Sequence, residues 1–356
     1  MIVTKDRKYI KDIAYKNAVD FLNSISYGGE LDFLHNGDYI FRGHESDKYK
    51  LLPTALRDYL FLNEMNPEDI DEKALASGIT ESFQVFAESL TLKTFFDICD
   101  NRGLDMPEVK RLRETMMLPI DVSTMAKQED WLPQELEEIA ALAQHYGLPT
   151  RLLDWTANLN TALYFASSGA IKRMLEPERL TRYEWSEETK RKLESARGCF
   201  ESKSYPKEEP DLMELWAFDR TILIPNIGKT NLHIIHPRYN KNPNLCAQDG
   251  LFSYWSIEKP LFNEIRNNKE PIIVDMETFD SKLVEDLERI NVQEKAYLYR
   301  ITIPYDAAPE LYSYAKSNGK DASTLFPGYD GVVRCMIEDK RLSRLKSKQE
   351  KNNSDK

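Results

Sequence analysis

The sequence predicts an α+β fold, with a central mixed or antiparallel sheet of short strands and a helical insertion. Short apolar or alternating runs, separated by Pro, Asn, Asp and Gly, fill the C-terminal part of the chain and are typical of strands. Apolar residues at helical spacing dominate much of the region between residues 67 and 175. With 356 residues, 41% of them apolar, the chain is long enough to build a large core.

Helices are predicted where helical spacing coincides with start and stop residues. The first is expected at residues 16–26, before a glycine turn. A mainly helical region follows at residues 67–128, and within it a helix at residues 80–103 ends on a glycine. Two more helices are expected at residues 132–147 and 160–175, the former with Pro near its first turn and Gly just past its end.

Strands are predicted in six runs rich in β-branched and aromatic residues: residues 39–44, 212–220, 231–236, 250–256, 270–276 and 296–305. Arg42 therefore lies at a strand end. Residues 148–156 show too little alternation for a strand, so we expect them to form a connection between two packed helices.

The runs suggest one domain at residues 1–339 that carries two insertions. The first, at about residues 58–130, is helical, and the second, at about residues 176–211, is rich in charge and is expected on the surface. Residues 340–356 are basic and end in a polar run, so we expect a helix that continues into a partly disordered tail.

Composition and missing motifs exclude several classes of protein. A net charge of −11 argues against a broad positive face for nucleic acid, although a local basic groove stays open. The four Cys are scattered, no signal-like segment precedes Lys5, and no apolar run reaches the ~18 residues of a membrane span, so we expect a soluble cytoplasmic protein without membrane association. P-loop, Rossmann, α/β-hydrolase and zincin motifs are missing. His233 and His236 would point to opposite faces of a strand, so no metal site is predicted.

Three sequence blocks carry most of the functional information: YIFRGH at residues 39–44, QHYGLPTRLLDWTANLNTALYFA at residues 144–166 and CAQDGLFSY at residues 246–254. Together they resemble the FRG domain family, and STLFPGYDGV at residues 323–332 resembles the family's closing segment. The resemblance spans nearly the whole chain. One departure is Leu159, where the family usually has Pro.

The order of the blocks is also similar, more distantly, to the ADP-ribosyltransferase fold. That resemblance implies an Arg on the first strand that grips NAD, which Arg42 followed by Gly43 fits. It implies a small polar strand-to-helix segment, here residues 150–156, and an acidic residue on a late strand. At the last place this chain has Gln248, with Asp249 beside it and Glu258 further on.

The chemistry of NAD cleavage makes these residue types suitable. Breaking the nicotinamide glycosidic bond passes through an oxocarbenium-like transition state, which a nearby carboxylate stabilises. The planar guanidinium of Arg42 suits a pyrophosphate, and Gly43 lets a ligand approach the backbone. Tyr146 or Trp155 could stack on nicotinamide or adenine. We therefore predict catalytic roles for Arg42, His145 and Gln248, and NAD contacts from Arg42, Gly43, His44, Tyr146, Thr150, Arg151, Asp154, Trp155 and Thr156.

Each of these residues also has a structural alternative. Arg42 could form a buried ion pair with Asp154. His145 could cap a helix or face solvent, and Trp155 could fill the core beside a turn anchored by Asp154. Gln248 could satisfy backbone groups at a strand edge. Tyr164 and Phe165 lie on an apolar helical stripe, so we expect both in the core.

The resemblances imply an NAD-dependent ADP-ribosyltransferase-like toxin or anti-phage defence enzyme that uses NAD as a substrate, needs no metal and modifies RNA or protein. Such an activity would need restraint by a partner antitoxin or chaperone. One alternative is a non-catalytic sensor that binds a nucleotide or nucleic acid. Another is a nuclease that uses His145 and Arg151, although a clear metal set is missing.

Overall fold

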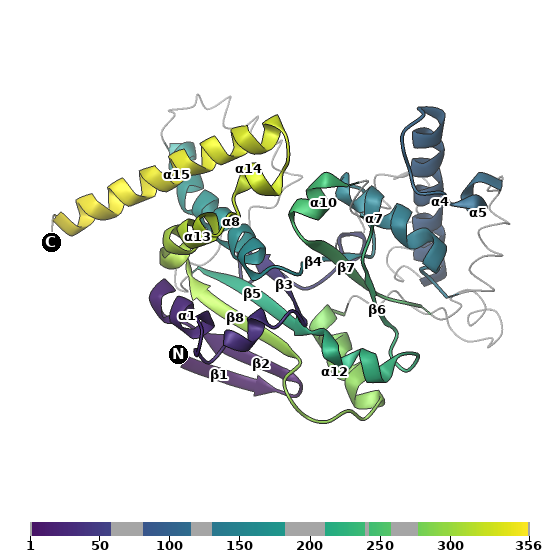
Figure 1. The fold of residues 1–356 in the computed structure, drawn as a ribbon, viewed down its shortest axis with the longest axis horizontal. Coiled ribbons are helices and arrows are strands. Elements are labelled where there is room, and N and C mark those ends of the chain that lie inside the picture. Colours follow the sequence, from purple (N-terminus) through teal and green to yellow (C-terminus); the bar gives the residue numbers. More distant parts are fainter. Residues whose placement is uncertain are drawn as a thin grey trace.

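The fold is built around one eight-stranded mixed sheet, as shown by a computed structural model that describes residues 2–57, 81–114, 130–181, 211–238, 242–257 and 277–354 (Figure 1). The strand order is β1-β2-β8-β5-β3-β4-β7-β6. The strands are β1 (Ile2–Arg7), β2 (Ile10–Ala14), β3 (Tyr39–His44), β4 (Leu153–Thr156), β5 (Leu212–Asp219), β6 (Leu232–Ile235), β7 (Gly250–Trp255) and β8 (Leu298–Pro304). The predicted α+β class with a mixed sheet is confirmed.

Pairing within the sheet is antiparallel except between β2 and β8, which run parallel. Strand β3 pairs along its whole length with β5, from Tyr39 opposite Asp219 to His44 opposite Glu214. On its other side β3 pairs with β4 at a single position, Phe41 opposite Thr156. The two strands therefore separate beyond Phe41.

The helices surround the sheet. They are α1 (Ala18–Ile25), α4 (Glu81–Asn101), α5 (Lys110–Glu114), α7 (Glu137–His145), α8 (Leu159–Thr181), α10 (Pro243–Ala247), α12 (Phe279–Arg289), α13 (Ala308–Ser317), α14 (Ala322–Leu325) and α15 (Tyr329–Ser354). Short 3-10 turns lie at Asp32–His35, Thr54–Leu56, Gln134–Leu136, Arg220–Ile222, Ile224–Asn226 and Tyr305–Ala307. Helices α8, α13 and α15 lie together, apart from α4, α5 and α7 (Figure 1).

The predicted helices at residues 16–26, 80–103, 132–147 and 160–175 are confirmed within a few residues. Gly103, which follows α4, has φ +67°, the left-handed conformation that a helix stop uses. Residues 58–80, 115–129 and 182–210, which make up much of both predicted insertions, lie outside the described residues. Helix α15 is continuous across residue 339, where the sequence suggested a boundary.

Two parts of the sheet differ from the prediction. Residues 148–156 were expected to form a connection only, but Leu153–Thr156 forms strand β4, which pairs with β7. A four-residue strand is too short for alternation to be recognised in the sequence. The hairpin of β1 and β2 was also missed, because its charged residues obscure the strand pattern. The strand predicted at residues 270–276 lies outside the described part of the chain.

Helix α8 packs directly on β3, at Gly43. A Cβ atom placed on Gly43 would lie 1.9 Å from the carbonyl oxygen of Ala162. Only glycine therefore permits this approach of helix to strand. Tyr164, two residues after Ala162, is fully buried as predicted, and its hydroxyl donates to Glu338 of α15 at 2.9 Å. Phe165, also expected in the core, is only partly buried because it lines a cavity.

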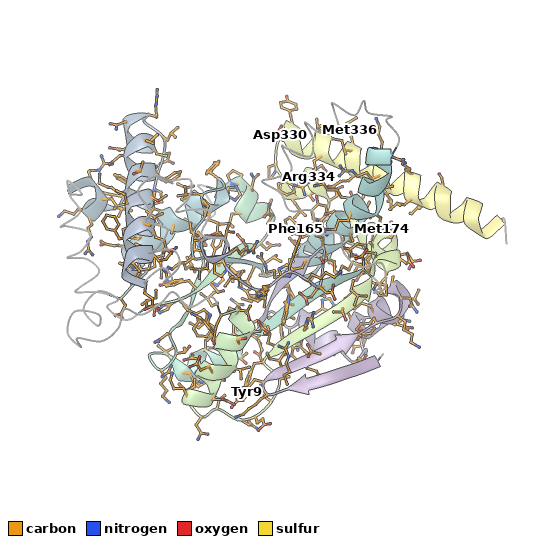
Figure 2. The ribbon with its side chains drawn as sticks, turned by 180° about the vertical axis from the view of Figure 1, so that it is seen from behind. Tyr9, Phe165, Met174, Asp330, Arg334 and Met336 are labelled. Atoms are coloured by element: carbon orange, nitrogen blue, oxygen red, sulfur yellow. The ribbon has the colours of Figure 1, made fainter. Side chains whose placement is uncertain are left out.

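Helix α15 packs against α8, and Figure 2 labels Arg334 and Met336 on α15 and Phe165 and Met174 on α8. The Arg334 guanidinium stacks over the Phe326 ring at 4.3 Å and also donates to Glu338 at 3.0 Å. Glu338 is only 5% exposed and joins the two helices. Among the described helices, none combines the length and the apolar character needed to cross a bilayer.

Gly43→Ala should destabilise the protein by about 3 kcal/mol, because the new methyl group meets a backbone oxygen that cannot rotate away. Urea unfolding followed by circular dichroism measures this change. Val19→Ala, at a position 58% exposed on α1, is the control and should shift the free energy of unfolding by less than about 1 kcal/mol. Equal stability of Gly43→Ala and wild type contradicts the packing argument.

Candidate functional site

A cavity of about 410 Å³ opens where β3 and β4 separate. This volume is within the range of small-molecule sites. Seven of the lining residues belong to the blocks and were predicted as site residues: Arg42, Gly43, His44, Asp154, Trp155, Thr156 and Gln248. Five others line the same cavity: Phe41, Glu45, Tyr49, Arg57 and Phe165. All three blocks therefore contribute to one cavity.

Arg42 forms part of the wall of this cavity, and hydrogen bonds to Asp154 and His44 hold its side chain in place. Its Nη1 donates to the backbone oxygen of Asp154 at 2.7 Å and lies 3.4 Å from Oδ2 of the same residue. Its Nε donates to Nε2 of His44 at 2.8 Å. The Arg42 side chain keeps 16% exposure and that of Asp154 keeps 57%, so the pair is not sealed in the interior. Nη2 makes no hydrogen bond with any described residue.

His44 connects Arg42 to a buried carboxylate. An arginine N–H can only donate, so Nε2 of His44 accepts and its proton lies on Nδ1. Nδ1 is 3.2 Å from Oε2 of Glu214, directly opposite on β5. Burial lowers the pKa of His44 well below its ordinary value, and the positive charges of Arg42, Arg57 and Arg300 add to this effect. The His44 ring is therefore neutral, and it lies between Arg42 and Glu214, with one ring nitrogen facing each of them.

Glu214 is a buried carboxylate behind the cavity that the sequence patterns did not predict. Its side chain is fully buried, and Oε2 also accepts from the indole N–H of Trp216 at 2.6 Å. Arg300 of β8 donates to Oε1. Burial raises the pKa of Glu214 to about 7, while the charge and hydrogen bond of Arg300 act to lower it. The available signal was a single carboxylate within the apolar run LMELWAF.

Glu45 and Tyr49 were also missed, and they form one cluster with α8. Oε1 of Glu45 accepts from Nε of Arg173 at 2.7 Å and from the Tyr49 hydroxyl at 2.9 Å. The Glu45 carboxylate is therefore neutralised by Arg173 although it lines the cavity.

The second block contributes three consecutive residues of β4, namely Asp154, Trp155 and Thr156. Asp154 is exposed, and its Oδ1 accepts from Nε2 of Gln144 at 2.8 Å. Thr156 donates to the backbone oxygen of Gln248 at 2.6 Å, which links the second block to the third. The Trp155 ring is 3% exposed and lies against Phe279, with centroids 5.1 Å apart. Trp155 thus fills the core, as its structural alternative stated.

Gln248 caps α10 just before β7, and its Nε2 donates to the backbone oxygen of Leu325 at 3.1 Å. The third block therefore contacts the closing segment of the sequence. Asp249 has φ +48° and pairs with Lys320 at 2.9 Å. Glu258, the remaining acidic candidate, lies outside the described residues.

Residues 37–174 match the family model of the FRG domain. This segment is therefore similar to the FRG domain. No curated protein and no solved structure gives a significant match to the chain. The resemblance expected from the sequence is thus confirmed for residues 37–174, which contain β3, β4, most of α8 and most of the cavity-lining residues.

Four predicted site residues do not line the cavity with Arg42. His145 lies on the last turn of α7, with Nε2 3.3 Å from Nδ2 of Asn244. Tyr146 is 71% exposed and packs edge-on against His145. Thr150 is buried and bonded to Gln144. The fourth residue is Arg151.

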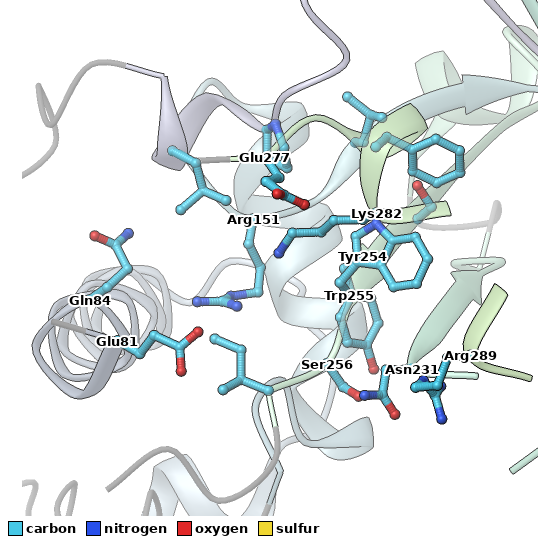
Figure 3. Close-up of a pocket in the computed structure, with 16 residues that line it drawn as sticks. Glu81, Gln84, Arg151, Asn231, Tyr254, Trp255, Ser256, Glu277, Lys282 and Arg289 are labelled. Carbon is cyan, nitrogen blue, oxygen red and sulfur yellow. The ribbon is translucent and has the colours of Figure 1, made fainter. Parts of the chain in front are cut away.

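Arg151 anchors α4 to the connection between α7 and β4. It is 6% exposed and forms two hydrogen bonds to Glu88, of 2.6 and 2.9 Å. The indole N–H of Trp131 donates to the same carboxylate at 2.6 Å. Arg151 borders a second cavity of about 420 Å³, where it lies between Gln84 and Lys282 (Figure 3). Its guanidinium is therefore committed to a buried ion pair.

The two histidines considered as metal ligands are His233, on β6, and His236, just after it. The His233 ring stacks on Tyr254 with centroids 4.9 Å apart, and Nε2 of His236 lies 3.2 Å from Arg220. Within the described residues, no group of three or more His, Cys, Asp or Glu side chains is arranged to hold a metal ion.

Arg151→Ala should lower the free energy of unfolding by about 3–5 kcal/mol, because it leaves the buried Glu88 carboxylate without its cation. Urea unfolding of Arg151→Ala, Glu88→Ala and the double variant forms a double-mutant cycle. The double variant should lose clearly less free energy of unfolding than the sum of the losses in the two single variants. Strict additivity would show that the two side chains do not act as a pair.

The variant Glu214→Gln tests the raised pKa of the buried Glu214 carboxylate, because that pKa makes the free energy of unfolding depend on pH. Since the folded-state pKa is about 7 and the ordinary value is 4.5, the folded protein retains this proton where the unfolded chain has lost it. The stability of wild type relative to the variant should therefore be highest below pH 4.5. It should fall by about 3 kcal/mol as the pH rises through 7.

Urea unfolding at pH 5 and pH 8 measures this difference. Glu310→Gln, an exposed position on α13, is the control and should show no such dependence. A stability difference between wild type and Glu214→Gln that grows with pH contradicts the assignment.

Proposed function

We propose that this protein is an NAD-dependent ADP-ribosyltransferase-like enzyme that modifies a macromolecule, either RNA or protein. The observation that carries the proposal is the meeting of three distant sequence blocks around one cavity. Arg42 on β3, Asp154 and Thr156 on β4, and Gln248 before β7 all line it, and β3, β4 and β7 are neighbours in the sheet. The ADP-ribosyltransferase fold, to which the sequence is distantly similar, uses blocks of these kinds in this order.

The separation of β3 and β4 supports NAD binding at this place. Phe41, Arg42, Gly43, His44 and Glu45 all line the cavity, as expected where a strand edge has lost its partner. Backbone groups along such an edge can bind the amide of nicotinamide. The free Nη2 of Arg42 can bind the pyrophosphate through charge-assisted hydrogen bonds.

Asp154 is the carboxylate that we propose for the reaction. Gln248 cannot carry a charge, Asp249 pairs with Lys320, and Glu45 is neutralised by Arg173. Asp154 lines the cavity with a side chain that is 57% exposed, and its distance to Arg42, 3.4 Å, is longer than those of the Asp249 and Glu45 ion pairs, 2.9 and 2.7 Å. In the transition state the bond between ribose C1′ and the nicotinamide nitrogen breaks, and its electron pair leaves with nicotinamide. The acceptor nucleophile then attacks C1′ and loses a proton, while Asp154 stabilises the positive charge on the sugar.

A role as a toxin or an anti-phage defence enzyme is part of the proposal, as is an antitoxin or chaperone partner, because uncontrolled NAD consumption would harm the producing cell. The second candidate function is a non-catalytic nucleotide-binding module. The bond from Gln248 to Leu325 favours it, since the third block then has a structural task in place of an acid. The nuclease alternative has no such support, because His145 and Arg151 do not line the cavity.

Arg42→Ala should abolish transfer of label from radiolabelled NAD to RNA or protein in cell extract, with a loss of at least about 100-fold. Its circular dichroism spectrum should remain that of the folded protein, because the side chain lines a cavity and is not sealed in the core. Arg42→Lys, which keeps the charge but loses the planar fork, should recover only part of the activity.

Three outcomes would count against this account. Unfolding of Arg42→Ala would identify a structural role. Binding of NAD by the wild-type protein without any label transfer would favour the non-catalytic module. RNA cleavage without NAD would favour a nuclease.

A further inference from the structure

Arg57 is a second cation on the cavity that contains Arg42. It follows the 3-10 turn Thr54–Leu56, and its Nε donates to the backbone oxygen of Leu52 at 2.8 Å. That hydrogen bond holds the Nε end of the Arg57 side chain in place. Its two terminal nitrogens make no hydrogen bond with any described residue, and the residue lines the cavity. Arg57 therefore presents a positioned guanidinium to the cavity.

The carboxylates around the cavity do not balance the positive charges of Arg42 and Arg57. The positive charge of Arg57 acts on both Arg42 and His44 and contributes to lowering the pKa of each. Glu45 does not balance it, because its carboxylate is bound to Arg173 and Tyr49. Asp154 lies 3.4 Å from Arg42 and is shared with Gln144. Two guanidiniums that face one cavity and repel each other are stabilised by an anion between them.

We propose that Arg42 and Arg57 together bind a diphosphate, with Arg57 on the second phosphate, so that the cavity takes a nucleoside diphosphate group. The inference rests on the proposed function, since it names the part of NAD that the cavity holds. Arg57 can form paired hydrogen bonds with phosphate oxygens through its two terminal nitrogens, and Arg42 can donate to the other phosphate from Nη2. Tyr49 and Phe165 provide aromatic surface in the same cavity for the rest of the nucleotide.

The test compares binding of ADP and AMP by isothermal titration calorimetry to the full-length protein. Arg57→Ala should weaken ADP binding at least tenfold and change AMP binding less than threefold, because only ADP has the second phosphate. Arg57→Lys should recover part of the ADP affinity. Arg102→Ala, an exposed cation just after α4, is the matched control and should bind both nucleotides as wild type does. Thermal unfolding of each variant confirms that it is folded.

The inference is overturned if wild type binds no ADP, if Arg57→Ala keeps the wild-type ADP affinity, or if it loses ADP and AMP equally. These results are separate from the test of the proposed function. Label transfer from NAD together with an unchanged ADP affinity in Arg57→Ala would refute the inference alone. Arg57-dependent ADP binding without any label transfer would support the inference and refute the proposed enzyme.

Discussion

The hydrogen bond from Arg42 to His44 is the constraint on which the candidate site depends. Because arginine always donates, His44 must stay neutral and keep its proton on Nδ1, facing Glu214. Glu214 is in turn held by Trp216 and Arg300. This buried chain crosses β3, β5 and β8 and fixes the direction of the Arg42 stem. The guanidinium is thereby placed on the cavity wall before any ligand arrives, which reduces the entropy lost on binding.

Arg42 and its neighbour Gly43 have different physical tasks. Arg42 supplies charge to the cavity, whereas Gly43 allows the carbonyl of Ala162 to approach the strand. The sequence analysis gave Gly43 a role in ligand approach, and the structure adds a packing role that glycine alone can fill. Since α8 begins just after β4, the contact at Gly43 also holds the second block beside the first.

The sequence was sufficient where a feature depends on local pattern or on the blocks themselves. It predicted the strand that contains Arg42, although Arg42 lies within β3 and not at its end, and the helix that contains the buried Tyr164. It could not predict Arg151 as an anchor, because its partner Glu88 is 63 residues away and only the fold brings them together. Glu214 was missed for a similar reason: its task depends on the register of β5 against β3, which no local pattern encodes. Arg57 lies outside all three blocks and joins the cavity only through the fold.

The state of His44 is the most direct test of this account. Nitrogen-15 NMR of protein labelled at histidine, with the His44 signal assigned by its loss in His44→Gln, reports which ring nitrogen carries the proton. The account predicts a neutral ring with the proton on Nδ1 at pH 7 and no second protonation near pH 6.5, the ordinary pKa. A ring that is protonated on Nε2, or that titrates near pH 6.5, would show that His44 does not accept from Arg42 and would contradict the proposed positioning of the guanidinium.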